Sequence, residues 1–117
     1  ALKPGGVMRV VVPDLALWCR NYSNNNTAFF DWYRTTYLAN NKTLFPTNGS
    51  VFMGMLYNWG HKMSYDEETL SCAISSTGFT RIERKSWSSS ESMQAMEHLE
   101  SNNPRQFESL ILECRKP

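Results

Sequence analysis

The apolar residues of this chain gather into a few runs, and the first of them lies close to the amino terminus. Residues 7–12 form a nearly unbroken apolar stretch rich in β-branched side chains, which predicts a strand buried on both faces, as in a parallel sheet. The turn Pro4-Gly5-Gly6 precedes it, because proline fixes φ and glycine permits positive φ. Pro13 is expected to end the strand, since proline has no N–H to donate to the ladder.

Two further strands are predicted nearer the carboxyl terminus. Residues 79–87 alternate only weakly and carry many charges, a pattern typical of an exposed sheet edge, where charges discourage further pairing. Residues 107–114 contain consecutive apolar side chains without alternation, which favours a central position in the sheet.

Amphipathic spacing predicts four short helices, over residues 15–22, 27–40, 49–59 and 64–77. The last of these is the best defined, because Ser64 and Glu67 have the spacing of a capping box. Gly78 stands where a left-handed residue commonly closes a helix. A weaker helical pattern covers residues 91–99.

Aromatic residues are concentrated in the middle of the chain: nine of the fifteen lie within residues 29–59. The overlapping stretch 43–60 contains no charged residue. Such a segment needs a partner surface, because large exposed apolar patches are rare on soluble monomers. Two interpretations stay open. The rings form the core of a helical segment, or they line a ligand pocket or a subunit contact.

Length, charge and cysteine usage exclude several classes of protein. A chain of 117 residues is sufficient for one small domain. With a net charge of +1 and scattered basic residues, nucleic-acid binding is not expected, and no apolar run is long enough to span a membrane. Three widely spaced cysteines predict free thiols in a reducing, cytoplasmic compartment. Together with His61 and His98 they lack the spacing of metal ligands, so no metal is expected.

The turn Leu2-Lys3-Pro4-Gly5-Gly6 and the strand after it resemble the segment that leads into the fifth strand of class I S-adenosylmethionine-dependent methyltransferases. The order of the remaining elements is similar: a helix ending in Ser-Thr-Gly-Phe at 76–79, a charged strand, and a final strand over 107–113. The resemblance covers nearly the whole chain but only the carboxyl-terminal half of the family's domain, as in a truncated, small bacterial methyltransferase-like protein. It implies an α/β fold with a Rossmann-type sheet of about three strands flanked by helices, in which the last strand is antiparallel and central.

The resemblance also implies a single partial domain over 1–117, with an aromatic-rich helical insertion over 24–60 that covers the substrate. In that family a glycine-rich loop after the first strand and an acidic residue ending the second bind the cofactor, and both would lie before Ala1. No Gly-x-Gly-x-x-Gly run occurs in the chain. We therefore expect no cofactor binding and no independent catalysis by this chain alone. Binding of S-adenosylmethionine is expected only when a complementary amino-terminal half is present.

Five residues are candidates for the substrate side of such a site: Asp14, Tyr57, Trp59, His61 and Tyr65. Asp14 follows the first strand, at the edge where ligands of open α/β sheets bind, but aspartate is also a preferred helix N-cap. His61 lies in a Gly-His-Lys segment that resembles one in small bacterial methyltransferases. Histidine suits a general base or a substrate hydrogen bond, although a lone loop histidine is commonly structural. Asp14 and His61 are the candidates for catalysis.

The first strand would lack the neighbour that the fifth strand has in the full family domain. Its open apolar edge is a template for pairing with another chain, so we expect a homodimer or a complementary chain as partner, and possible binding of a small-molecule acceptor. Two other functional interpretations stay open. The chain is a standalone small-molecule-binding or protein-interaction module derived from that fold, or it is an incomplete domain without activity.

Overall fold

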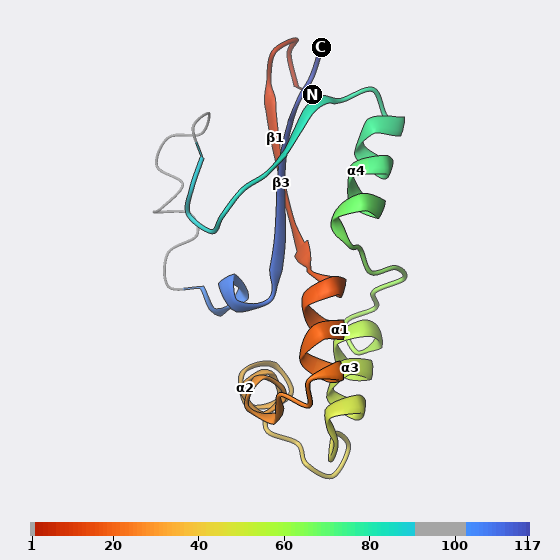
Figure 1. The fold of residues 1–117 in the computed structure, drawn as a ribbon, viewed down its shortest axis with the longest axis vertical. Helices are drawn as coiled ribbons and strands as arrows, with labels where there is room; N and C mark the ends of the chain where they lie inside the picture. Colours follow the sequence, from red (N-terminus) through yellow and green to blue (C-terminus); the bar gives the residue numbers. More distant parts are fainter. Residues whose placement is uncertain (1, 91–102) are drawn as a thin grey trace. The chain divides into compact units, whose positions relative to one another are not determined.

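The computed structural model describes residues 2–90 and 103–117, which contain four α-helices, one 3₁₀ helix and three strands (Figure 1). The chain divides into two compact units. The sheet unit consists of residues 1–14 and 65–117, and the helical unit is Leu15–Ser64. The helix expected over 91–99 lies outside the described residues.

The sheet unit is built on β1 (Val7–Pro13), β2 (Thr80–Arg84) and β3 (Ser109–Arg115). The strand order is β1-β3-β2, and both outer strands run antiparallel to β3. The predictions of a central, antiparallel last strand and of a charged edge strand are thereby confirmed. Five consecutive residues of β3 are buried, as a strand with a neighbour on each side requires. A short 3₁₀ helix, η1 (Pro104–Phe107), leads into it.

β1 is less buried than predicted, although it ends at the expected residue. Most of its residues are half-buried rather than buried on both faces, and Val11 is 38% exposed. β1 ends at Pro13, as expected, although Pro13 itself is still paired with Ser109 as the last residue of the ladder. The direction of the backbone groups along β1 explains why a proline fits into this last pair.

The backbone hydrogen bonds at the two ends of β1 show which residues face β3. Asp14 donates its N–H to the carbonyl oxygen of Glu108, and Lys116 donates its N–H to that of Gly6, at 2.8 and 2.9 Å. In an antiparallel pair the backbone groups alternate in direction, so the even-numbered residues of β1 face β3. Pro13 has an odd number, and its missing N–H therefore removes no bond from the ladder.

One face of the sheet packs against α4 (Glu67–Ser76) (Figure 1). Leu70 and Ile74 of this helix form a buried cluster with apolar side chains of all three strands: Met8, Val10, Val12, Ile82, Leu110, Leu112 and Cys114. Burial of this apolar surface is the main stabilising term available to the sheet unit.

The ends of α4 confirm one prediction and correct another. The N-cap is Asp66, whose side chain accepts the N–H of Thr69 at 2.8 Å. The predicted capping box of Ser64 and Glu67 is wrong, because Asp66 occupies the cap position and the helix begins at Glu67. Gly78 adopts the expected left-handed conformation, with φ +93°, which glycine adopts without steric cost.

The opposite face of the sheet carries charges. Arg9, Glu113 and Glu83 lie in one row across β1, β3 and β2. Arg9 and Glu113 form an ion pair at 3.0 Å, and both side chains are 5% exposed. Arg9 also donates to the carbonyl oxygens of Ser86 and Ser89, each at 2.9 Å. Removing one partner of such a pair leaves a buried charge, at a cost of about 3–5 kcal/mol. Glu113 thus holds the Arg9 guanidinium on the sheet, and the two hydrogen bonds of Arg9 attach the segment after β2 to it.

The helical unit consists of α1 (Leu15–Ser23), α2 (Thr27–Tyr37) and α3 (Asn48–Tyr57), which pack around the fully buried Trp18. The rings of Phe29 and Tyr33 meet the Trp18 indole edge-on, with centroids at 4.8 and 4.7 Å. Edge-on pairs of this kind add to the gain from burial. For residues 29–59, the interpretation of the aromatic side chains as core is confirmed for the three that are buried with Trp18: Phe30, Tyr33 and Phe52.

α2 and α3 are shorter than predicted. α2 ends at Tyr37 rather than at residue 40, where Ala39 and Asn40 adopt positive φ values of 52° and 50°. Residues with positive φ cannot continue a right-handed helix. α3 begins with a reciprocal capping pair of Thr47 and Ser50, which satisfies two backbone donors at the helix start.

Candidate functional site

A buried carboxylate stands at the end of β1. Asp14 is 1% exposed, and Nη2 of Arg84 lies 3.0 Å from its Oδ2. The second nitrogen of the same guanidinium, Nη1, lies 3.0 Å from Oε2 of Glu67. The hydrogen bond to Glu67 is the main cause that raises the pKa of Arg84. A permanently charged guanidinium therefore compensates the buried Asp14 carboxylate, as a buried charge requires.

Tyr65 is the second candidate residue at this place. It forms an isolated parallel bridge with Asp14, and its half-buried ring packs against the apolar core of the sheet unit. The structure thus brings two of the five predicted site residues together. The contact of Asp14 with Arg84 could not be predicted, because the two residues are 70 positions apart in the sequence.

A second buried carboxyl group, that of Glu108, belongs to the residue hydrogen-bonded to Asp14 on the neighbouring segment. The sequence did not point to this residue. Glu108 immediately precedes β3 and accepts the Asp14 N–H at 2.8 Å through its backbone carbonyl. It is 3% exposed, and its Oε2 has no hydrogen-bond partner among the residues that the structure describes. Burial raises the pKa of Glu108 to about 7, and the nearby charge of Arg105 opposes this shift only in part.

Asp14 and Glu108 are therefore two carboxyl residues with different environments at one end of the sheet. Asp14 is matched by a cation, whereas Glu108 is desolvated and exchanges its proton close to pH 7. Pairs of acidic groups in contrasting environments are typical of acid–base sites. The arrangement can hold a polar substrate group at Asp14 or its Arg84 partner and can exchange a proton at Glu108.

The three other candidates belong to the helical unit, where His61 has a defined contact. Its Nδ1 lies 2.8 Å from the carbonyl oxygen of Met55. Since a carbonyl oxygen only accepts, Nδ1 carries the proton of the neutral ring and Nε2 keeps its lone pair. His61 and Tyr57 line a cavity of about 110 Å³ together with Leu56, Lys62, Met63 and Ser64. The neutral ring is thus held as a tautomer that can act as a base through Nε2.

Trp59 has a structural contact within the same unit. Its indole Nε1 donates to the hydroxyl of Tyr33 at 3.1 Å, while half of the side chain stays exposed. This bond ties the segment after α3 to α2. The five predicted site residues are therefore divided, with Asp14 and Tyr65 in the sheet unit and Tyr57, Trp59 and His61 in the helical unit.

A larger cavity of about 420 Å³ lies along α3 and its preceding loop. Its lining is mostly apolar, and three of the contributing side chains are exposed large apolar residues: Leu44, Met53 and Tyr57. Concave apolar surfaces of this size are typical of small-molecule or peptide sites.

Among residues 2–90 and 103–117, no group of histidine, cysteine, aspartate or glutamate side chains is arranged to hold a metal ion. In the same part of the chain, no helix has the length and apolarity needed to cross a bilayer. No protein-family model, curated protein or solved structure matches this chain.

Glu108 makes a pH-dependent contribution to stability. Its pKa is about 7 in the folded chain, against an ordinary value of 4.5, so the folded state binds the proton more tightly than the unfolded state. The contribution is complete below pH 4.5 and is lost as the pH rises through 7. This corresponds to a fall of about 3 kcal/mol in the free energy of unfolding.

The measurement is urea denaturation of the wild type and of Glu108→Gln across that pH range. Because glutamine does not titrate, the difference between the two proteins isolates Glu108, and we expect Glu108→Gln to be the more stable at neutral pH. A difference that stays constant from pH 4.5 to 7 would contradict a buried, proton-binding Glu108.

Proposed function

We propose that this chain is the substrate-side, carboxyl-terminal portion of an S-adenosylmethionine-dependent methyltransferase. It acts together with a polypeptide segment that carries the glycine-rich cofactor loop. The observation that supports this most is the strand order β1-β3-β2 with an antiparallel central β3, followed by the buried carboxyl groups at the end of β1. In open α/β sheets this end of the strands is where ligands bind.

Methyl transfer needs little covalent help from the protein, because the sulfonium of the cofactor is already electrophilic and the enzyme mainly aligns a nucleophile with it. In this proposal Asp14, held by Arg84, orients the polar group of the acceptor. Glu108, with a pKa of about 7, accepts the proton that the acceptor loses.

The cofactor part of the proposal predicts that the isolated 117-residue chain does not bind S-adenosylmethionine. Isothermal titration is expected to give no saturable heat, because the chain has no glycine-rich loop to approach the cofactor. Saturable binding in the micromolar range would contradict the proposed division of the site between two segments.

The genomic sequence directly upstream of the codon for Ala1 tests whether a segment with the glycine-rich cofactor loop accompanies this chain. An in-frame strand, glycine-rich loop and helix would support a methyltransferase. An upstream coding region for an unrelated kind of domain would contradict it.

The partner of this chain is proposed to pair with the open edge of β1, either as a second copy or as a complementary segment. Backbone groups of the odd-numbered residues point away from β3, and Val11, partly exposed, is one of them. Among the described residues, β1 pairs only with β3. An apolar edge of this kind attracts another strand.

Val11→Pro is the substitution that tests this edge. Proline removes the outward N–H of residue 11 but leaves the β1–β3 ladder intact, so we expect a folded chain with weakened association. The matched control is Val10→Pro, which removes an N–H that faces β3 and should destabilise the fold by about 1–3 kcal/mol, because a backbone acceptor of β3 loses its partner. Light scattering at high micromolar concentration and thermal denaturation give the two readouts. A wild type that is monomeric throughout, or a Val11→Pro chain that associates as strongly as the wild type, would contradict pairing of copies through β1.

The second candidate function is a standalone small-molecule-binding module. The exposed apolar side chains around the 420 Å³ cavity on α3 favour it, since Leu44 and Tyr57 are 68% and 71% exposed. In that case ligands would bind without any methyl donor, and a thermal-shift screen would find apolar compounds whose effect is lost in Tyr57→Ala.

A further inference from the structure

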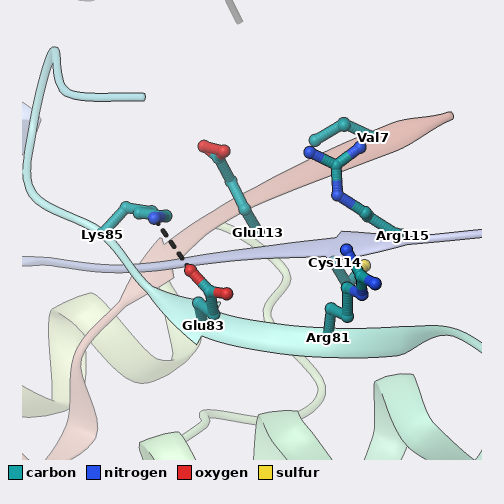
Figure 2. A pocket seen from close by; sticks show the side chains of 7 residues that line it. All are labelled: Val7, Arg81, Glu83, Lys85, Glu113, Cys114 and Arg115. Atoms are coloured by element: carbon teal, nitrogen blue, oxygen red, sulfur yellow. Dashed lines mark hydrogen bonds and ion pairs between the residues drawn. The ribbon is translucent and has the colours of Figure 1, made fainter. Parts of the chain in front are cut away.

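The charged face of the sheet, opposite α4, is hollowed at one end. A cavity of about 200 Å³ is lined by residues of all three strands and of the segment just after β2: Val7, Arg81, Glu83, Lys85, Glu113, Cys114 and Arg115. Figure 2 shows Arg81 and Arg115 toward one end of this cavity and the pair of Lys85 and Glu83 toward the other. The lining contains three cationic side chains and two carboxylates.

A bulge in β2 places Arg81 at this cavity. Thr80 is opposite Arg115 and Glu83 is opposite Glu113, with a register shift between the two pairs. Two residues of β2 therefore stand opposite the single residue between them on β3, which is the definition of a bulge. Ile82 packs into the core on the α4 side, whereas Arg81 lines the cavity.

The backbone of Arg81 is in an unfavourable conformation. Its φ of +51° lies in the left-handed region, where the side chain of an L-residue crowds the following carbonyl oxygen. Glycine would occupy this position without that crowding. A strained residue that carries a cation into a cavity is a feature from which function can be inferred.

Both carboxylates of the cavity already have intramolecular partners. Lys85 Nζ lies 2.9 Å from Oε2 of Glu83, the contact drawn as a dashed line in Figure 2. Glu113 is paired with Arg9 at 3.0 Å and accepts from Ser90 Oγ at 2.7 Å. The positive charges at the other end of the cavity are thus not required to neutralise these carboxylates.

The Arg81 guanidinium is the group available to a ligand. It makes no hydrogen bond or ion pair with any other residue that the structure describes, and its charge acts only at a distance, as a minor cause that lowers the pKa of Glu83. Arg115, whose Nη1 donates to the carbonyl oxygen of Gly5 at 3.3 Å, brings a second guanidinium to the same end.

We propose that this cavity binds the oxyanion group of a small molecule, a carboxylate or a phosphate, through the guanidinium fork of Arg81, with Arg115 as the second cation. Planar guanidinium groups match both oxyanions with two parallel hydrogen bonds. About 200 Å³ exceeds the roughly 30 Å³ that one water molecule takes in the liquid, so the cavity has room for an organic acid or a phosphate ester. The proposal does not depend on methyl transfer.

The test is an amide-shift titration of the full chain by nuclear magnetic resonance, with sodium phosphate in one arm and sodium acetate in the other. Sodium chloride keeps the ionic strength constant, and chloride alone is the reference. We expect saturable shifts at residues 81 and 115 in at least one arm, and the stronger arm identifies the oxyanion. Non-saturable shifts, or shifts spread over basic residues of both units, would overturn the proposal.

Two variants and a matched control make the test specific. Arg81→Gln is expected to weaken binding about tenfold or more, since hydrogen bonds to a charged group are worth roughly 1.5–3 kcal/mol. Arg20→Gln removes an exposed arginine of α1 and should leave the affinity unchanged. Arg81→Gly should melt at the same or a higher temperature than the wild type, because glycine accepts φ +51°, and should bind as weakly as Arg81→Gln. Wild-type affinity in either Arg81 variant would contradict the assignment.

Discussion

The pairing of β3 with both other strands is the constraint on which the sheet unit depends. β3 contributes five consecutive buried residues and hydrogen-bonds β1 on one side and β2 on the other. β1 and β3 come from opposite ends of the chain, so this pairing closes a loop that includes the whole helical unit. Closing so long a loop costs conformational entropy, which burial of Leu110, Leu112 and Cys114 beneath α4 offsets.

The same pairing explains where the polar groups lie. Because side chains alternate across a strand, β3 turns Leu110, Leu112 and Cys114 toward α4. It directs Glu113 to the opposite face, where Arg9 compensates it. Beyond the first residue of β3 the ladder continues to Glu108 and Asp14, so two carboxyl residues reach the end of the sheet. Sheet register, rather than any local motif, produces both the charged face and the carboxyl pair.

Local chemistry made much of the fold predictable from the sequence. The apolar runs at 7–12 and 107–114 locate two strands within one or two residues, and Gly78 marks the end of α4. The start of that helix was misassigned because Ser64 and Asp66 both stand in plausible cap positions, and only the hydrogen bond to Thr69 distinguishes them. The compact helical unit is Leu15–Ser64. Trp18 is the centre of its aromatic core. This central position depends on tertiary packing and cannot be predicted from the spacing of apolar residues.

The sequence predicted a residue of the candidate site only where the neighbouring residues in the chain determine its place in the fold. Asp14 follows a strand and could be identified, and Tyr65 meets it through a backbone bridge. Glu108 and Arg81 could not be found, because burial of the first and the left-handed backbone of the second arise from register between distant strands. Conversely, Trp59 and His61 were candidates for the substrate side of a site, while the structure gives each a contact within its own unit.

Hydrogen–deuterium exchange of the β1 amides in the dilute chain tests the central claim, that β3 pairs with one edge of β1 and leaves the other available to a partner strand. The account predicts slow exchange at Met8, Val10 and Val12, whose backbone groups face β3, and fast exchange at Val11. Exchange at Val11 as slow as at Val10 in the dilute chain would contradict an open edge, and fast exchange at all of these positions would contradict the pairing with β3.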